Sequence, residues 1–363
     1  MMKWNLMYVL VFIVTLSSCS KDDDTKVSLD TPVIYSISPQ EARPGSVVTI
    51  EGANFSRLRV DNKFFFNGVE AEIIHFNETT MHVRAPEGSE TGPVSVNVAG
   101  QVAEGPVFTY IQPPAPTGEK VVVKVLSIGA QPWSAAGAHN TQQYLNYYGE
   151  LAKSLDVDFM VAREMDSVTN RSLKVDRPKY LSEISGMDNY MFSRAILAGY
   201  QGGQFGIAVY SKHPILSQHS VSLNNNRTLG FVRVQLTPKS QVVFGGVQLE
   251  DVIGSQALRN QQAALMSEIL NDIMVPTIVA GGIYMLGQEP LADPMFQVFD
   301  KAGYIPGCTM CDFTFPANAS TPAIADFIMY RWAREAKVLK YEVLDPAPGA
   351  NRSPAYAEIE LSL

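Results

Sequence analysis

The residue types that could carry chemistry in this chain stand at the ends of apolar runs. The clearest example is the run Ile278–Ala280, which leads directly into Gly281-Gly282-Ile283-Tyr284. An apolar run that ends in a glycine-rich turn is typical of a buried strand that delivers residues to a cleft. This turn is therefore the first candidate site.

The cysteines Cys308 and Cys311 form a C-x-x-C pair. In an exported protein this spacing suits a short-loop disulfide. A zinc site would need more nitrogen or sulfur ligands, and the chain has no second C-x-x-C. A redox pair would need a thioredoxin-like context, which is absent here. A disulfide and two packed thiols remain as the alternatives.

The N-terminus reads as a targeting segment, because Lys3 precedes the short apolar run Leu6–Leu16. Leu16-Ser17-Ser18-Cys19 resembles a bacterial lipobox, which implies a lipoprotein signal peptide over residues 1–18 and lipidation of Cys19. The alternative is an ordinary cleaved signal. Residues 19–30 then form an acidic tether, and their Asp run resembles the export signal of some Gram-negative surface lipoproteins. We therefore expect a lipid anchor in the outer membrane, with the protein facing the cell exterior.

Length and composition set further limits. The chain has 363 residues, of which 46% are hydrophobic and 18% are charged, as in a well-packed protein of two domains. The formal net charge of −8 argues against nucleic acid as a partner, because phosphates require a basic surface. Composition leaves the oligomeric state open.

Residues 31–112 alternate in short stretches that turn residues interrupt, which predicts a small all-β sandwich. The stretch Pro44–Phe55, followed by Thr91–Val96 and Phe108–Tyr110, closely resembles the IPT/TIG family, which implies an immunoglobulin-like sandwich. The resemblance implies a spacer or a binding module. Residues 113–119 are rich in proline and predict a semi-rigid linker.

Residues 120–363 mix strands with two clear helices, predicted over Thr141–Leu155 and Ser255–Ile273, which indicates a layered α/β sandwich. Asp158–Glu164, Gly206–Ile215 and Ile324–Ile328 resemble, in order, sequence motifs of the endonuclease/exonuclease/phosphatase superfamily, and this resemblance implies an α+β four-layer sandwich, the DNase I-like fold. This resemblance implies a metal-dependent phosphoesterase scaffold.

The resemblance also implies which positions would carry catalysis. Glu164 stands at the position of the metal ligand, and Asp326 at the position that orients a terminal His. The other positions are substituted, at Gly129, Gln248, Gly282, Tyr284, Asn351 and Arg352. Neither Gln248 nor Arg352 can act as a base near neutral pH. Glu164 is read either as a remaining metal ligand or as a carboxylate paired with a neighbouring Arg. For Asp326 we predict an ion pair with Arg352, with an exposed and weak Asp as the alternative.

The substituted positions predict a domain that has lost phosphoesterase chemistry and serves in binding or scaffolding, without a cofactor. Aromatic and amide side chains at the cleft could receive an uncharged glycan, with the candidates Trp133, Gln248, Tyr284, Asn351 and Arg352. Packing of the same rings, an anion held by arginines such as Arg163, and a surface-protein partner are the alternatives. The competing enzyme hypothesis is a phosphodiesterase, phosphatase or nuclease that uses Glu164 and Mg²⁺ or Mn²⁺.

Overall fold

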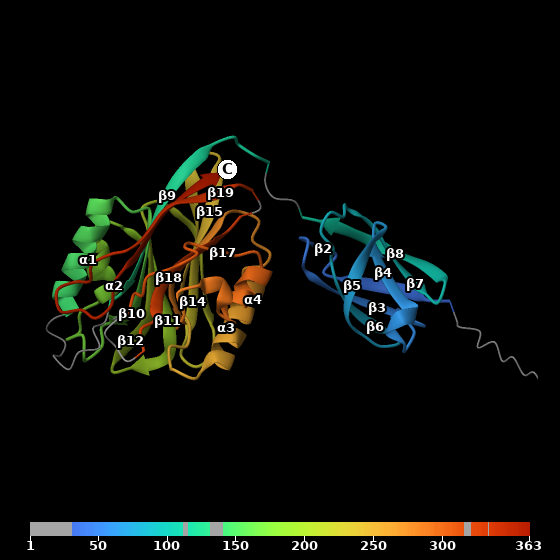
Figure 1. The fold of residues 1–363 in the computed structure, drawn as a ribbon, viewed down its shortest axis with the longest axis horizontal. Coiled ribbons are helices and arrows are strands. Elements are labelled where there is room, and N and C mark those ends of the chain that lie inside the picture. The colour runs from blue at the N-terminus through green and yellow to red at the C-terminus, as the bar shows by residue number, and fades with distance from the viewer. Residues whose placement is uncertain (1–30, 112–114, 131–140, 316–320, 333) are drawn as a thin grey trace, which may run out of the picture. The chain divides into compact units, whose positions relative to one another are not determined.

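A computed structural model describes residues 31–111, 115–130, 141–315, 321–332 and 334–363. The chain divides into two compact units between Tyr110 and Ile111, and Figure 1 shows both. The predicted signal peptide, the acidic tether with Cys19, and Trp133 lie outside the described residues. None of the helices in the described part has the length and apolarity needed to cross a membrane.

The first domain is all-β, as predicted. Within the described residues its strands follow the order β1-β3-β6-β5-β4-β7-β8-β2. Their side chains alternate in burial, and the buried ones, including Ile50, Phe64 and Phe108, form a core of their own. The strands are β1 (Val33–Ser38), β2 (Glu41–Ala42), β3 (Val47–Ala53), β4 (Asn62–Phe66), β5 (Val69–Phe76), β6 (Thr80–Arg84), β7 (Gly92–Val98) and β8 (Gln101–Tyr110).

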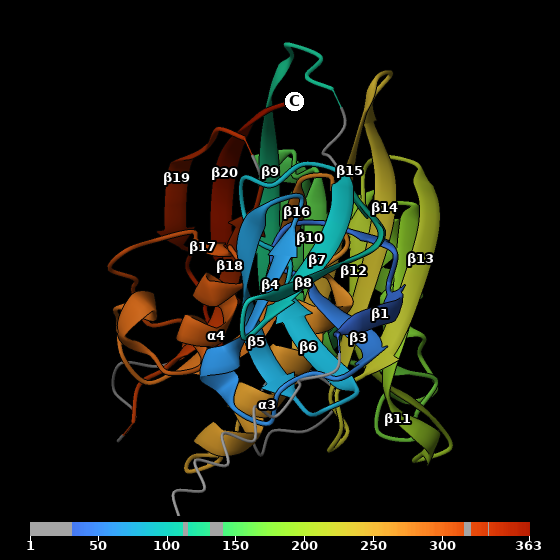
Figure 2. The ribbon, with the colours of Figure 1, turned by 90° about the vertical axis from the view of Figure 1, so that its right-hand side faces the viewer.

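The second domain contains two sheets. The first sheet has the order β11-β12-β10-β9-β20-β19, and Figure 2 shows β9, β20 and β19 side by side. Its strands are β9 (Lys120–Gly129), β10 (Phe159–Ser167), β11 (Asn189–Tyr200), β12 (Gly203–Ser211), β19 (Ala336–Val343) and β20 (Ala355–Ser362). The second sheet has the order β13-β14-β15-β16-β18-β17. Its strands are β13 (Ile215–Ser222), β14 (Thr228–Thr237), β15 (Ser240–Gln248), β16 (Thr277–Met285), β17 (Ile305–Pro306) and β18 (Ile324–Arg331).

The two sheets pack face to face, and helices cover their outer faces, so the domain has four layers (Figure 1). Phe159 and Phe244 stack between the sheets with ring centroids 4.7 Å apart. The helices α1 (Thr141–Leu155) and α2 (Arg177–Ser185) cover the first sheet. The helices α3 (Gln256–Ile269) and α4 (Phe296–Lys301) cover the second sheet. Because apolar side chains fill both spaces between sheet and helices, each sheet is buried on both faces.

The structure corrects three details of the sequence prediction. It adds the helices α2 and α4 to the two that were predicted. The helix predicted to reach Ile273 ends at Ile269, and a turn follows it, in which the Ile273 N–H donates to the Leu270 carbonyl at 3.3 Å. The predicted linker is also attached to the second domain at one end. The backbone N–H groups of Thr117 and Gly118 donate to the carbonyl of Leu363, so this end of the linker is part of the second domain.

Candidate functional site

The strands that carry the candidate residues end at a common edge of the domain. In the first sheet, Arg163 of β10 lies opposite Gly129 at the end of β9. In the second sheet, Gly282 of β16 lies between Gln248 of β15 and Asp326 of β18. Since β9 and β10 are parallel, as are β15 and β16, their carboxyl ends deliver these residues together.

A buried arginine joins the two sheets at this edge. Arg163 is 1% exposed, and its Nε and Nη2 donate to the Asp326 carboxylate oxygens at 2.8 and 2.6 Å. Its Nη1 donates to Glu164 Oε1 at 3.0 Å. Asp326 is fully buried and also accepts a hydrogen bond from Ser127 Oγ at 3.0 Å. Burial alone would lower the pKa of Arg163, but attraction and hydrogen bonding from Asp326, with Glu164, raise it above its usual value.

The Arg163 side chain occupies the space that two glycines leave open. A Cβ atom added to Gly282 would lie 3.1 Å from Arg163 Cδ. A Cβ atom added to Gly129 would lie 3.1 Å from Arg163 Nη2 and 3.0 Å from Arg352 Cδ. Those distances are shorter than ordinary van der Waals contacts. The two glycines and the arginine are therefore parts of one packing arrangement.

A second buried arginine completes the cluster and corrects the predicted pairing. Arg352 is 6% exposed, and its Nη1 lies 3.1 Å from Glu164 Oε1. Its guanidinium carbon also lies 5.5 Å from the centroid of the Phe315 ring. The predicted Asp326–Arg352 ion pair is wrong, because Arg163 takes both Asp326 oxygens. Glu164 instead has the arrangement given as the alternative to a metal ligand, a carboxylate paired with arginines.

The four charged groups, Arg163, Arg352, Glu164 and Asp326, are called the charge quartet below. Their formal charges cancel, since two are cations and two are carboxylates. Burial and repulsion from Arg163 lower the pKa of Arg352, although Glu164 partly opposes this. The quartet therefore has a net formal charge of zero inside the domain.

Several buried polar atoms at this edge have no hydrogen-bond partner within the described residues. They are Glu164 Oε2, Gln248 Oε1, Asn351 Oδ1, Arg352 Nε and Arg352 Nη1. The Nη1 atom is within ion-pair distance of Glu164, but the geometry is not that of a hydrogen bond. Leaving a buried donor or acceptor unpaired costs about 1–3 kcal/mol, so these atoms need water or a ligand.

Bulges place the backbone of Glu164 and Tyr284. Both residues have left-handed backbone, with φ of 59° and 58°, and both lie where the register with the neighbouring strand shifts. Non-glycine residues in this conformation are uncommon and gather at functional sites. Tyr284, however, has its ring against the guanidinium of Arg259 of α3, with the centroid 5.6 Å away. It is held by α3 and has no described contact with the quartet.

A further buried carboxylate follows the end of β15. Glu250 is 1% exposed and accepts hydrogen bonds from Arg227 Nη2 and from the backbone N–H of Val252, each at 3.1 Å. Asn225 Nδ2 donates to its other oxygen. Burial alone would raise the pKa of Glu250, but these hydrogen bonds and the charge of Arg227 bring it below the usual value. This carboxylate supports the loop after β15.

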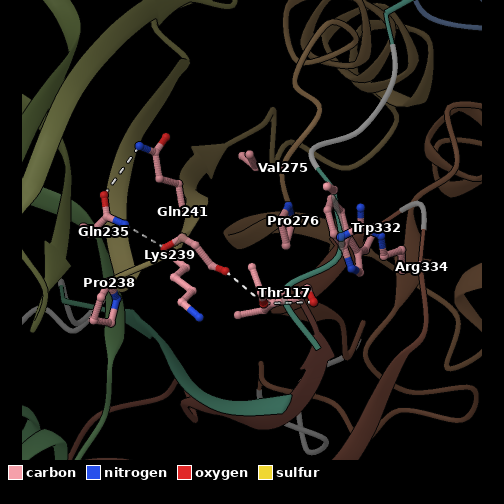
Figure 3. A pocket seen from close by; sticks show the side chains of 12 residues that line it. Thr117, Gln235, Pro238, Lys239, Gln241, Val275, Pro276, Trp332 and Arg334 are labelled. Carbon is pink, nitrogen blue, oxygen red and sulfur yellow. Dashed lines mark hydrogen bonds between the residues drawn. The ribbon is translucent and has the colours of Figure 1, made fainter. Parts of the chain in front are cut away.

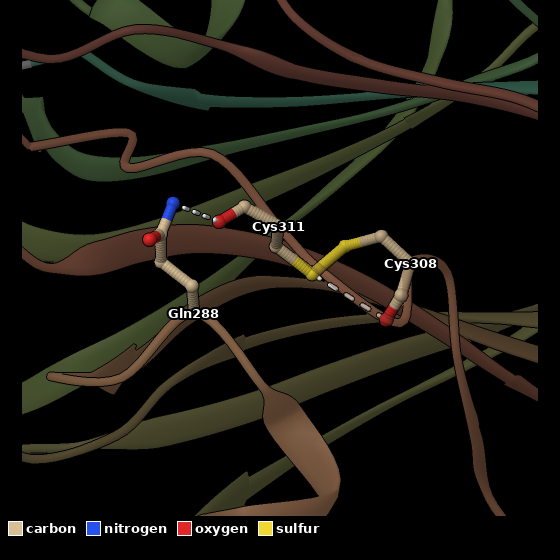
Figure 4. The surroundings of a disulfide bond; sticks show 3 residues. All are labelled: Gln288, Cys308 and Cys311. Atoms are coloured by element: carbon tan, nitrogen blue, oxygen red, sulfur yellow. Dashed lines mark hydrogen bonds between the residues drawn. A yellow bond between two sulfur atoms is a disulfide. The ribbon is translucent and has the colours of Figure 1, made fainter.

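Cys308 and Cys311 form a disulfide, one of the two states that the sequence left open (Figure 4). Gln288 Nε2 donates to the Cys311 carbonyl at 3.2 Å, and the Cys311 N–H donates back to the Gln288 carbonyl at 2.8 Å. The disulfide closes a short loop within the segment before Thr314, and the two hydrogen bonds to Gln288 attach that segment to the loop that follows β16. Within the described residues, no three His, Cys, Asp or Glu side chains gather closely enough to hold a metal ion.

Comparison with known proteins agrees with this architecture. Residues 32–110 match the family model of the IPT/TIG domain. An endonuclease/exonuclease/phosphatase family protein from Bacteroides thetaiotaomicron is similar in structure over 68% of this chain and 100% of that chain, with 14% identity and a TM-score of 0.52. The larger domain has the endonuclease/exonuclease/phosphatase fold. A mannosyl-6-phosphatase from Bacteroides thetaiotaomicron VPI-5482 is similar over 65% of this chain and 99% of that chain, with 14% identity and a TM-score of 0.51.

A third similar structure is an endonuclease/exonuclease/phosphatase from Beutenbergia cavernae DSM 12333. It is 16% identical, covers 66% of this chain and 72% of that chain, and has a TM-score of 0.51. At these identities the likeness shows the fold alone. A search of curated protein sequences finds no match to the chain.

Proposed function

We propose that the endonuclease/exonuclease/phosphatase-fold domain no longer hydrolyses phosphoesters and that its strand ends bind a ligand instead. One observation carries the proposal: both carboxylates retained at the family's catalytic positions are taken by arginines. Arg163 holds Asp326 with two hydrogen bonds, and Arg163 and Arg352 share Glu164 Oε1. A carboxylate in this state is a structural counter-ion.

The residues present do not fit a divalent cation. Magnesium needs one or two carboxylates whose oxygens are free to replace water. Here only Glu164 Oε2 has no partner, and two guanidinium groups lie within about 3 Å of the other oxygen of the same carboxylate. Adding two positive charges to a neutral buried quartet would leave them uncompensated, which is costly in a protein interior.

General base catalysis also lacks a candidate at the substituted positions. Gln248 and Arg352 occupy the positions where the family has His, and neither accepts a proton near neutral pH. Gly282 has no carboxylate. Removal of one acid or base group typically lowers a rate by about 10²- to 10⁴-fold.

The competing hypothesis is an active hydrolase rebuilt around Glu164, and its unpartnered Oε2 is the observation in its favour. The test is hydrolysis of bis-p-nitrophenyl phosphate, DNA and mannose 6-phosphate with Mg²⁺ or Mn²⁺. Mannose 6-phosphate is included because a similar structure is named a mannosyl-6-phosphatase. We expect no turnover above buffer, and a Glu164→Ala variant that behaves identically. Turnover that Glu164→Ala abolishes would establish the enzyme hypothesis and refute ours.

The ligand that we propose is an uncharged glycan. The unpartnered atoms include three acceptors, on Glu164, Gln248 and Asn351, and donors on Arg352. A sugar hydroxyl both donates and accepts, so several hydroxyls could satisfy this mixed set. If no glycan binds, the alternatives are a scaffold role and a surface-protein partner.

A glycan-array screen tests this binding. Asn351→Ala and Gln248→Ala each remove one unpartnered acceptor and should weaken any hit, whereas Trp133→Ala tests the aromatic candidate outside the described residues. The exposed Lys301 of α4 provides the matched control, as Lys301→Ala should leave binding unchanged. Absence of any hit, or hits that none of the site variants alters, would leave only the scaffold role.

For the whole protein we propose a lipoprotein at the cell surface, with the IPT/TIG domain as a spacer. The support is the lipobox-like sequence at Cys19 and the acidic run that follows it. A lipid anchor contributes about 0.8 kcal/mol for each buried CH₂ group. Metabolic labelling with a fatty acid should mark the wild type and not Cys19→Ala, and equal labelling would disprove the anchor. Proteolysis of intact cells should then remove the protein if it faces outward.

A further inference from the structure

A cavity of about 390 Å³ beside the β14–β15 hairpin uses its polar groups within the protein. Gln235 Nε2 donates to the Ser240 carbonyl at 3.2 Å, and Gln241 Nε2 donates to Gln235 Oε1 at 3.5 Å (Figure 3). Thr117 Oγ1 donates to the Leu363 carbonyl at 3.1 Å. These groups already have partners, so the exposed surface of the larger domain is the stronger candidate for a further interaction.

Three loops at the strand-end edge of the second sheet concentrate exposed apolar side chains. Residues 249–255 follow β15, residues 286–295 follow β16, and residues 307–315 lie between β17 and β18. Among the described residues, the larger domain exposes eleven large apolar side chains, and five of them lie in these loops. They are Val252, Ile253, Leu286, Leu291 and Met310, with exposed fractions from 42% to 62%. Single exposed apolar residues are ordinary, but a group of them marks an interaction surface.

Contacts between neighbouring loops join them into one surface. Arg259 of α3 connects the first two loops. Its Nη1 donates to the Val252 carbonyl at 3.0 Å, and its guanidinium lies 5.6 Å from the centroid of the Tyr284 ring, just before the second loop. The second and third loops are connected by Gln288 Nε2, which donates to the Cys311 carbonyl at 3.2 Å (Figure 4). The surface formed by the three loops is called the loop surface below.

The loop surface is negatively charged, because its three loops contain five carboxylates and no Lys, Arg or His. The carboxylates are those of Glu250, Asp251, Glu289, Asp293 and Asp312. Arg227 pairs with the first two at 3.1 and 2.7 Å, and the buried Arg259 donates to the Glu250 carbonyl, so two cations offset the first loop. Glu289 and Asp312 are exposed and have no ion pair within the described residues. The adjoining helix α4 contains one Asp and one Lys and adds no net charge.

We propose that the loop surface binds a basic peptide segment that also carries large apolar side chains. The apolar side chains of the segment are removed from water against Leu286, Leu291 and Met310. Its Lys or Arg groups face Glu289 and Asp312. Charge decides between the occupants, because these carboxylates repel an anionic membrane or a nucleic acid, and a second copy of this chain carries the same carboxylates. The loop surface lies beside the strand-end site but uses none of its residues, so the proposal is independent of glycan binding and of the loss of hydrolysis.

The test is calorimetric titration of the whole protein with a synthetic amphipathic peptide made of Leu and Lys. Two control peptides change one property each: the first has Glu in place of every Lys, and the second has Ser in place of every Leu. We expect the Leu–Lys peptide to bind at least about tenfold more tightly than either control, since both its charge and its apolar side chains are needed. Vesicles of uncharged phosphatidylcholine lipid should not bind the loop surface, and binding that Leu286→Ser weakens would indicate a lipid surface and overturn the proposal.

Matched charge variants separate the loop surface from the net charge of −8, which attracts any cationic peptide. The double variant Glu289→Gln/Asp312→Asn should weaken binding of the Leu–Lys peptide about tenfold at low ionic strength, and less at high ionic strength. Glu150→Gln/Glu183→Gln removes the same charge from exposed positions on α1 and α2 and should change the affinity by less than about twofold. Equal effects of the two double variants would overturn the proposal.

Apolar variants complete the test. Leu286→Ser/Met310→Ser should weaken binding of the Leu–Lys peptide at least about tenfold, because two contacts of the segment are lost. Leu216→Ser/Leu339→Ser replaces apolar side chains of similar exposure outside the loops and should leave the affinity unchanged. Circular dichroism spectra like that of the wild type confirm that both variants are folded. The proposal is also overturned if the Leu–Lys peptide does not bind at millimolar concentration, or if the Glu peptide binds as tightly.

Discussion

Replacement of Arg163 by Met is the most direct test of the charge quartet. The substitution keeps most of the side-chain length and removes the positive charge. It leaves Asp326, which is fully buried, with only its hydrogen bond from Ser127. Removing one partner of a buried ion pair costs about 3–5 kcal/mol. For a domain of this size each kcal/mol shifts the unfolding midpoint by about 2–4 °C, so a drop of roughly 6–20 °C is expected.

Differential scanning calorimetry is the appropriate measurement, because it can separate the transition of the larger domain from that of the IPT/TIG domain. Arg194→Met is the matched control, since Arg194 lies exposed on β11 of the same domain and should change stability by less than about 0.5 kcal/mol. The double variant Arg163→Met/Asp326→Asn should be more stable than the sum of the two single changes predicts. The reasoning fails if Arg163→Met costs no more than Arg194→Met.

Three further substitutions test the surroundings. Gly282→Asp restores the family's carboxylate but puts a Cβ 3.1 Å from Arg163 Cδ, so it should cost about 1–3 kcal/mol in urea unfolding, and less when combined with Arg163→Gln. Equal costs in both backgrounds would show that the arginine does not fill that space. Glu250→Gln should destabilise the domain near neutral pH. Folding lowers the pKa of Glu250. The ionised carboxylate therefore stabilises the folded domain above the unfolded pKa of about 4.3, and this contribution is lost as pH falls through the folded pKa. The gap between the urea midpoints of variant and wild type should therefore close below pH 4, and a constant gap from pH 3 to 7 would contradict this. Replacing both cysteines by Ser should lower the unfolding midpoint by the equivalent of about 2 kcal/mol, the value for so short a loop, and the variant should no longer respond to a reductant.

Sequence patterns identified best those elements of the larger domain in which apolar residues recur at regular spacing. The helix over Thr141–Leu155 has the predicted bounds. The helix α2 was missed, although Pro178 near its start and Gly186 in left-handed backbone at its end are ordinary helix boundary signals. Its nine residues give only about two and a half turns, too few for the apolar period to stand out.

The candidate site was harder to predict for a different reason. Each substituted position was read alone, so Gly129 and Gly282 counted only as missing side chains. What occupies the space beside a glycine depends on residues distant in sequence, and here it is Arg163. The available signal was Arg163 itself, which stands directly before Glu164 in the sequence. Pairing Asp326 with Arg352 followed the resemblance, in which this Asp orients the terminal His that Arg352 replaces, but the resemblance does not reveal which arginine lies nearer to Asp326.

The quartet explains how the fold tolerates Gly129, Gly282 and Arg352 at these strand ends. Two sheets that converge on buried carboxylates need a counter-charge at that edge, and unpaired charges there would destabilise the domain. Arg163 provides that counter-charge to Asp326, and it fits only because Gly129 and Gly282 are small. The glycines and the arginine therefore depend on one another, and a larger side chain at either glycine should lower the stability of the domain. An edge built in this way has no net formal charge, and Arg352 places two buried nitrogen atoms there that have no hydrogen-bond partner within the described residues.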